Sequence, residues 1–294
     1  MVNALSSGQV MAEFRGQSPA DRDRIVKALG DKAVVQESPW VCSLVVSFNT
    51  KKKPFDDVRV RRALNLAIDR WSGSQALGKI ALVREVGGLL RPGYDLAVSQ
   101  KDLEQLPGFR RDMDRNRAEA RKLLAEAGQS GMSFTLLNRN VKMPYEPVGV
   151  FLIDQWRQIG LNVEQNVLPT APFFQALMQD PPTFDVTMDF NCQAIVNPTA
   201  DIQRFISKDR TDGNHGHYTD RKLDELYDAQ LREPVFAKQK KIVTEFQTYL
   251  NNQAYFMTTL WWNRITLQSS SVQGWYITPS HYLNQQLETV WLKK

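Results

Sequence analysis

The chain contains few of the residues on which metal and redox sites depend. Its 294 residues include three histidines and two cysteines, Cys42 and Cys192. The cysteines form no Cys-x-x-Cys pair, which argues against a structural zinc site. The sequence leaves open whether they are free thiols or a disulfide, because a disulfide requires their Cα atoms to lie within about 7 Å of each other.

Long apolar runs and a strong charge are also missing. No segment approaches the roughly 18 consecutive apolar residues of a membrane span. Residues 1–10 lack the basic start and the apolar stretch of a secretory signal peptide. The net charge is +5, and the basic side chains are scattered over turns and helices. We expect no nucleic-acid partner, because such binding needs basic residues gathered on one face.

The familiar catalytic patterns are absent as well. The sequence has no Gly-x-Ser-x-Gly, no phosphate-binding glycine loop and no Cys–His arrangement. His215 and His217, with Asp212 or Asp220 nearby, motivate a metal-dependent hydrolase as an alternative function. A His-x-His pair without a placed third ligand is a weak signal. We therefore expect no catalytic residue, no metal and no cofactor.

Residues 48–70 are the most informative segment that is present. A strand over 43–49 leads into a basic turn that ends at Pro54. Asp56 or Asp57 can then cap a helix, because a carboxylate accepts the free N–H groups of the first turn. The following apolar residues fall on one helical face: Val60, Leu64, Ala67 and Ile68.

The rest of the chain predicts alternating helices and strands. The expected helices cover residues 19–29, 114–128, 147–159, 171–179, 223–231 and 235–251. The expected strands cover residues 9–14, 32–37, 41–49, 133–138, 161–167, 184–190 and 255–262. Such alternation is typical of an α/β fold in which helices cover parallel strands.

The order of residues in the segment 49–70 is more specific than its secondary structure. It reads Asn-x-x-x-x-Pro-Phe-Asp-Asp-Val-Arg-Val-Arg-x-Ala-Leu-x-x-Ala-Ile-Asp-Arg. This closely resembles the hallmark of the family 5 extracytoplasmic solute-binding proteins, the peptide/nickel/opine-type receptors of bacterial ABC importers. Residues 4–13, 114–128 and 154–164 are similar to further family elements in the same order, although Met11 stands where the family usually has aspartate.

The resemblance implies a periplasmic-binding-protein-like fold (type II, cluster C) whose two lobes close on a solute. The hallmark comes early in this chain, so we expect only the C-terminal part of such a receptor. Residues 46–257 would form a complete lobe 2, and residues 1–45 and 258–294 would be parts of lobe 1. The lobe 1 parts would expose apolar surface through which the chain could self-associate: Trp40, Phe256, Trp261 and Trp262.

The implied function is binding and not catalysis. The parent protein would be periplasmic, would capture a peptide-like or other small polar solute, and would deliver it to an ABC permease in the inner membrane. A receptor-like protein that only docks on a permease remains a further alternative, because a docking surface has no recognisable motif.

Three strand ends supply the candidate solute contacts, because ligands of open α/β sheets lie beyond the carboxyl ends of strands. The candidates are Asn138, Lys142, Tyr145, Asp189, Asn191, Gln193, Asn197, Trp261 and Trp262. By resemblance, Tyr145 matches an aromatic residue that the family places beside a proline. Peptide-binding members have an aspartate for the peptide ammonium where this chain has Ala194, which argues against the usual peptide mode. We expect Arg264, which follows the tryptophans, to lie at the surface.

Overall fold

The protein folds around a six-stranded mixed sheet. The computed structural model describes residues 2–195, 197–280 and 287–293. The strand order is β2 (Val83–Glu85), β6 (Phe256–Ser269), β1 (Ala33–Phe48), β5 (Val186–Cys192), β3 (Ser133–Arg139) and β4 (Asn162–Leu168). β3 runs parallel to β4 and β5, whereas the pairs formed by β1 and β6 are antiparallel. The parallel sheet that the alternation predicts is therefore present only in part.

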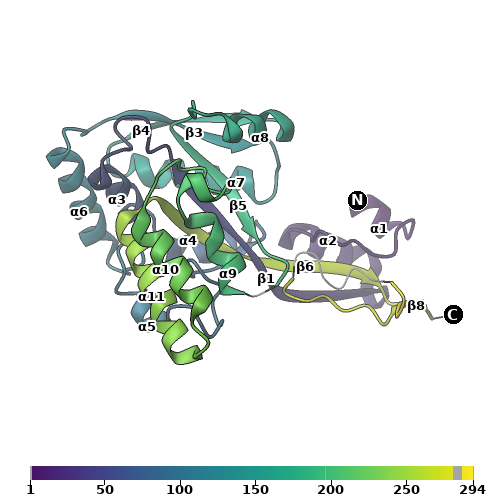
Figure 1. Cartoon of the computed structure of the whole chain (residues 1–294). Helices are drawn as coiled ribbons and strands as arrows, with labels where there is room; N and C mark the ends of the chain where they lie inside the picture. The colour runs from purple at the N-terminus through teal and green to yellow at the C-terminus, as the bar shows by residue number, and fades with distance from the viewer. Residues whose placement is uncertain (1, 196, 281–286, 294) are drawn as a thin grey trace.

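Strand β1 is a single strand of 16 residues and covers both segments predicted over 32–37 and 41–49. It pairs with β6 from Ala33, opposite Ser269, to Ser47, opposite Phe256, and the register shifts between Pro39 and Val45. Figure 1 shows both strands leaving the main sheet together and extending toward the two chain ends. We call residues 2–39, 263–280 and 287–293 the arm, and the other described residues the body.

The arm also holds two helices and a small second sheet. Helix α2 (Pro19–Leu29) begins at the Ser18 cap and ends at Gly30, as predicted. It is preceded by α1 (Val2–Ser6), and β7 (Val272–Gln273) pairs with β8 (Trp291–Leu292). The strand predicted over 9–14 is wrong, since that segment makes one isolated bridge, from Ala12 to Gln268.

The two faces of the body sheet carry separate cores. Val46 belongs to the largest apolar cluster, and its neighbour Val45 belongs to a second one, because successive side chains of a strand point to opposite faces. The first face is covered by α3 (Val58–Leu66), α4 (Arg70–Leu77), α6 (Met113–Glu126) and α7 (Tyr145–Arg157). The second face is covered mainly by α10 (Arg221–Arg232) and α11 (Phe236–Gln253).

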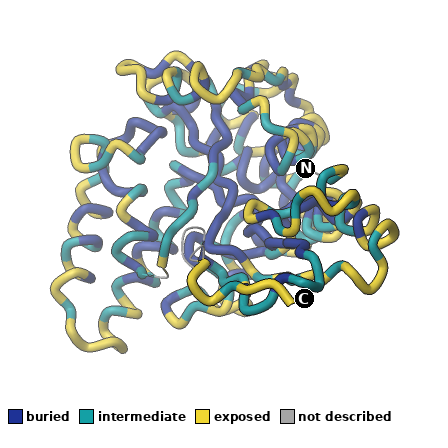
Figure 2. Tube along the Cα trace, turned by 90° about the vertical axis from the view of Figure 1, so that its right-hand side faces the viewer, coloured by how far each residue is buried: buried dark blue, intermediate teal, exposed yellow. Residues whose placement is uncertain are grey.

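The other α-helices of the body are α5 (Gln100–Leu103), α8 (Thr170–Met178) and α9 (Pro198–Ile202). Figure 2 shows the buried residues concentrated along the central strands. Among the described residues, none of the helices has the length and apolar character needed to cross a membrane.

The apolar residues that we expected the lobe 1 parts to expose are buried. Trp40, Phe256, Trp261 and Trp262 are 3%, 4%, 2% and 7% exposed. The prediction is wrong because Trp40 and Trp262 belong to the core of one sheet face and Phe256 to the core of the other, while the Trp261 indole donates to the Gly88 carbonyl. Exposed large apolar side chains of the arm lie elsewhere, at Tyr276 and Trp291 for example.

The predicted helix after Pro54 is confirmed, and its cap is Asp57. The Asp57 carboxylate accepts a hydrogen bond from the Arg59 N–H at 2.8 Å and pairs with the Arg59 guanidinium at 2.6 Å. Hydrogen bonds from Arg59 lower the pKa of Asp57. Asp56 is exposed and is not the cap residue of this helix.

Replacing Asp57 with alanine should reduce the free energy of unfolding by about 1 kcal/mol at neutral pH, since the first turn loses its cap. The lowered pKa means that this contribution is present above the pKa of the unfolded state and is lost as the pH falls through the folded-state pKa. Denaturant titrations at neutral and acidic pH would measure both effects. Asp56→Ala is the matched control, and an equal loss in that variant would contradict the assignment.

Candidate functional site

A cavity of about 800 Å³ opens where the arm meets the body. It lies on the sheet face that carries the largest apolar cluster, to which Trp40, Tyr145 and Trp262 belong. The arm contributes Glu13, Phe14, Arg15, Gly16 and Arg264. The body contributes Trp40, Leu82, Arg139, Val141, Lys142, Met143, Tyr145, Phe190, Cys192 and Trp262.

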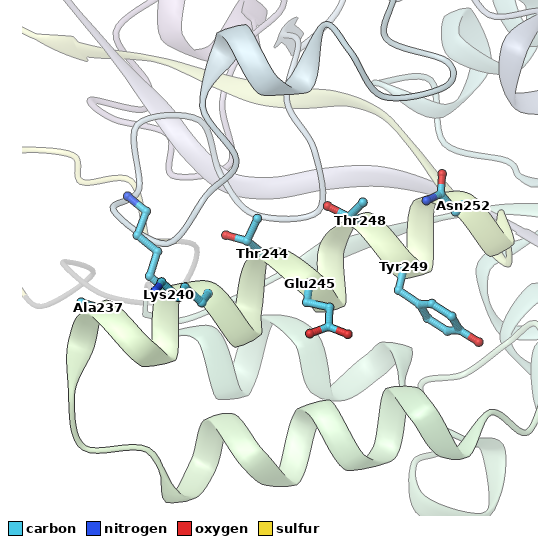
Figure 3. Close-up of a pocket in the computed structure, with 8 residues that line it drawn as sticks. Ala237, Lys240, Thr244, Glu245, Thr248, Tyr249 and Asn252 are labelled. Atoms are coloured by element: carbon cyan, nitrogen blue, oxygen red, sulfur yellow. The ribbon is translucent and has the colours of Figure 1, made fainter.

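Another hollow, of about 730 Å³, runs along the surface of α11. Figure 3 shows that Thr244, Thr248 and Asn252 project from one side of this helix. Every residue that lines the hollow belongs to α11. A hollow lined by one helix cannot enclose a small molecule, so the cavity between arm and body is the better candidate.

A row of three aromatic rings forms one wall of the cavity. The ring centroids of Trp40 and Trp262 are 5.3 Å apart, and those of Trp262 and Tyr145 are 6.3 Å apart, both edge to face. We call Trp40, Trp262 and Tyr145 the aromatic row. An arginine guanidinium lies over each end of it, with Arg264 5.1 Å from the Trp40 centroid and Arg139 4.2 Å from the Tyr145 centroid.

The charges that line the cavity are mainly positive: Arg15, Arg139, Lys142 and Arg264 oppose the single acid Glu13. The Glu13 carboxylate accepts hydrogen bonds from the backbone N–H groups of Arg15 and Gly16, both at 2.8 Å. It also accepts one from the side chain of Gln17 at 3.0 Å. Its charge is therefore already stabilised within the arm, and the cavity presents cationic groups to a ligand.

Two polar atoms of the aromatic row lack partners. The Trp262 Nε1 atom and the Tyr145 hydroxyl are buried and make no hydrogen bond with any residue that the structure describes. Burial, aided by the charge of Asp189, raises the pKa of Tyr145, so its hydroxyl stays protonated and can donate. Buried donors of this kind are unfavourable unless they meet an acceptor, and a bound solute would supply one.

The predicted contact residues fall into two groups. Lys142, Tyr145 and Trp262 line the cavity, whereas Asn138 and Trp261 do not. The Asn138 amide donates to the Tyr145 carbonyl at 2.9 Å and to Gln165, and the Trp261 indole donates to the Gly88 carbonyl. These two side chains support the fold around the site, and contact of any predicted residue with a solute stays a prediction.

The predicted residues in β5 and in the loop after it also lie away from the cavity. Asp189 is buried and pairs with Arg204 at 3.4 Å. Asn197 caps α9, and Gln193 donates to Asn191 and to the Ala200 carbonyl. Strand alternation explains the placement of Asp189 and Asn191, since their neighbours Phe190 and Cys192 line the cavity and successive side chains point to opposite faces.

The two loop histidines do not come together around a common point. His215 contacts Arg204 at 3.0 Å, and burial lowers the pKa of His215 to about 2, so it is neutral. His217 lies 3.8 Å from Asp180. Within residues 2–195, 197–280 and 287–293, no group of three or more His, Cys, Asp or Glu side chains could hold a metal ion.

Sequence reasoning missed several cavity residues. The prediction of a surface position for Arg264 is wrong: it is 2% exposed and donates to the Phe14 carbonyl while lying over Trp40. Arg139 is the last residue of β3 and could have been noticed at that strand end. Trp40 has no local signal, because its place depends on the β1–β6 pairing. The two cysteines form a disulfide, which the sequence had left open.

A family model described as bacterial extracellular solute-binding proteins, family 5, middle part, matches residues 1–213. The periplasmic oligopeptide-binding protein OppA of Salmonella typhimurium is 28% identical over 232 residues, which cover 76% of this chain and 40% of OppA. The glutathione-binding protein GsiB of Pectobacterium atrosepticum is 29% identical over 164 residues, which cover 54% of this chain and 29% of GsiB. This chain therefore spans less than half the length of these relatives.

Solved structures show the same fold. The substrate-binding protein CtaP of Listeria monocytogenes superposes with a TM-score of 0.84 at 17% identity, over 100% of this chain and 58% of CtaP. The binding protein AgaA from Agrobacterium (A. tumefaciens R10), in complex with agropinic acid, superposes with a TM-score of 0.82 at 19% identity, over 100% of this chain and 58% of AgaA. The two-lobe α/β fold class expected from the sequence is confirmed by these similarities.

Proposed function

Because this chain belongs to the family 5 bacterial extracellular solute-binding proteins, we propose that it is part of the substrate-binding component of an ABC importer. It captures a peptide-like or other small polar solute and presents it to a permease in the inner membrane. The relatives named above are binding proteins and not enzymes, and we assign a binding role here too. A periplasmic location for the parent protein follows from the same relationship.

The cavity between arm and body is the observation that carries this proposal. Two-lobed binding proteins hold a solute between parts that move relative to each other. The cavity is lined from both sides, for example by Arg264 of the arm and Tyr145 of the body. We propose that residues 46–257 form lobe 2 and that residues 1–45 and 258–294 are parts of lobe 1. In this division β1 and β6 are the two segments that connect the lobes.

A thermal-shift screen of the 294-residue chain tests the function. The panel contains peptides, opines, sugars and metal chelates, each at up to millimolar concentration. A solute present at 100 times its Kd is expected to stabilise the chain by about 2.7 kcal/mol, which appears as a rise in Tm. If no member of the panel raises the Tm, the proposal is overturned.

The variant Trp262→Phe tests the location of the site. It keeps an aromatic ring in the row but removes the unpartnered Nε1 donor, so we expect the affinity for any solute found to fall about tenfold. Trp291→Phe is the control, because Trp291 is 57% exposed on β8 of the arm. If calorimetric titration gives the same affinity for the unaltered chain, Trp262→Phe and Trp291→Phe, the solute binds outside the cavity.

A further inference from the structure

The turn between α10 and α11 carries apolar side chains that lie outside the core. Three large ones are about half exposed: Leu231, Val235 and Phe236. The apolar cluster beneath these two helices has Tyr227 as its last member in α10 and Val243 as its first in α11. Residues 231–241, which we call the tip, therefore extend beyond that core. In Figure 1 the two helices run side by side, and the turn that joins them lies at the bottom of the view, away from the strands.

The tip is also basic. It contains four cationic side chains and one acid, Glu233, which leaves a net charge of +3. The cations are all exposed: Arg232, Lys238, Lys240 and Lys241. Among the residues that the structure describes, no carboxylate lies within 4.0 Å of them, and the acids next in the sequence, Asp228 and Glu245, pair with cations outside the tip, each at 2.7 Å. The positive charge of the tip is thus available to a partner.

The lysines lie at the end of α11 where a helix disfavours positive charge. α11 begins at Phe236 without a side-chain cap, and its first turn contains no acidic residue. Free N–H groups and aligned peptide dipoles give this end a partial positive charge, which disfavours a cation such as Lys238. A negatively charged partner would be attracted by the helix end and by the lysines together. Figure 3 shows Ala237 and Lys240 at this end of the helix, beside the turn.

We propose that the tip docks on the anionic surface of a phospholipid bilayer. In an interfacial segment, apolar side chains enter the boundary between head groups and acyl chains, while Lys and Arg side chains meet the phosphates. The tip presents both kinds of group on a turn, and Val235 and Phe236 do not line the hollow along α11 that could receive a segment of another protein. The inference goes beyond solute capture, although the proposed encounter with a permease takes place at such a surface.

Co-sedimentation of the 294-residue chain with vesicles tests this docking. One type of vesicle is phosphatidylcholine alone, and the other is an equal mixture of phosphatidylcholine and phosphatidylglycerol. We expect binding to the anionic vesicles to be tighter by about tenfold or more, because each basic residue near such a surface strengthens binding about fivefold. Added salt should weaken this binding by screening the charges. Equal binding to the two types of vesicle, or binding to neither, overturns the inference.

Charge variants test the role of the lysines. A triple variant with Lys238→Gln, Lys240→Gln and Lys241→Gln should bind the anionic vesicles about a hundredfold more weakly, since three cations are lost. The matched control removes three exposed cations on α2 and α6: Lys27→Gln, Arg115→Gln and Lys122→Gln. Both variants have the same net charge, so an equal loss of binding in the two would show an effect of overall charge and would overturn the assignment to the tip.

Apolar variants test insertion into the bilayer. Val235→Ser combined with Phe236→Ser should weaken binding to the anionic vesicles about tenfold, because less apolar surface leaves water on docking. Val150→Ser combined with Met178→Ser is the control, since these side chains are exposed on α7 and α8. The control should bind as tightly as the unaltered chain. Unchanged binding of the Val235/Phe236 variant would rule out insertion and overturn the proposal.

Sedimentation velocity without vesicles distinguishes a second copy of the chain as the partner. A dimer that is lost in the Val235/Phe236 variant, found together with no preference for anionic vesicles, would assign the tip to self-association and overturn docking on a bilayer. Neither result affects the proposed function, because the tip and the cavity between arm and body share no residue. The thermal-shift screen of solutes tests that function independently.

Discussion

Replacing Arg70 with methionine is expected to lower the free energy of unfolding by about 3–5 kcal/mol, because each buried carbonyl left without a donor costs roughly 1–3 kcal/mol. Arg70 is 1% exposed. Its guanidinium donates to the backbone carbonyls of Thr258 at 2.7 Å, Gly108 at 2.6 Å and Asn65 at 3.3 Å, and also to the Asn65 side chain. The planar guanidinium of Arg70 thus links β6, the loop before α6 and the end of α3 through hydrogen bonds.

The charge of Arg70 persists at neutral pH. Burial lowers the pKa of Arg70 to about 9, which still leaves the side chain protonated at pH 7. Arg70→Lys should recover only part of the lost free energy of unfolding, since a lysine ammonium cannot reproduce the hydrogen-bond geometry of the planar guanidinium. Arg115→Met is the control for the loss of a surface arginine. Denaturant titration showing equal stability for Arg70→Met and Arg115→Met would refute the bridging role.

Removing the Cys42–Cys192 disulfide should cost about 2–5 kcal/mol of unfolding free energy. The bond closes a loop across a sequence separation of 150 residues, so its loss releases much conformational freedom in the unfolded chain. The two residues are also paired in register between β1 and β5. Melting curves of the oxidised chain and of the variant with both cysteines changed to alanine measure the difference.

Reductant provides the matched control for this experiment. The chain has no other cysteines, so a thiol reagent should lower the Tm of the unaltered protein and leave the double variant unchanged. An oxidised protein whose Tm does not respond to reduction would show that the pairing contributes no stability.

Local signals in the sequence predicted most of the individual elements. Ser18 with Pro19 and Gly30 defined α2 closely, and the caps around Asp57 placed the start of α3. The direction and neighbours of the strands were not predictable in this way. The antiparallel pairing of β1 with β6 joins residues more than 200 positions apart, and no local pattern specifies it.

The site was predictable to a similar degree. Lys142 and Tyr145 could be found because they follow a strand end, and Trp262 because the strand predicted over 255–262 ends in tryptophans, although β6 continues to Ser269. Asp189 and Asn191 were chosen by side-chain type, but strand alternation directs them to the other face. Arg139 resembled an ordinary surface cation, because it lies among three aromatic rings that come from α7, α8 and β5.

The interrupted register of β1 has a mechanical consequence for the whole molecule. The polypeptide passes between arm and body twice, once along β1 and once along β6. Regular pairing breaks between Pro39 and Val45, and an irregular ladder bends more readily than a regular one. The disulfide between Cys42 and Cys192 ties the middle of this stretch to β5. We therefore expect bending to be concentrated just before Cys42, where it would change the position of Trp40 in the cavity wall.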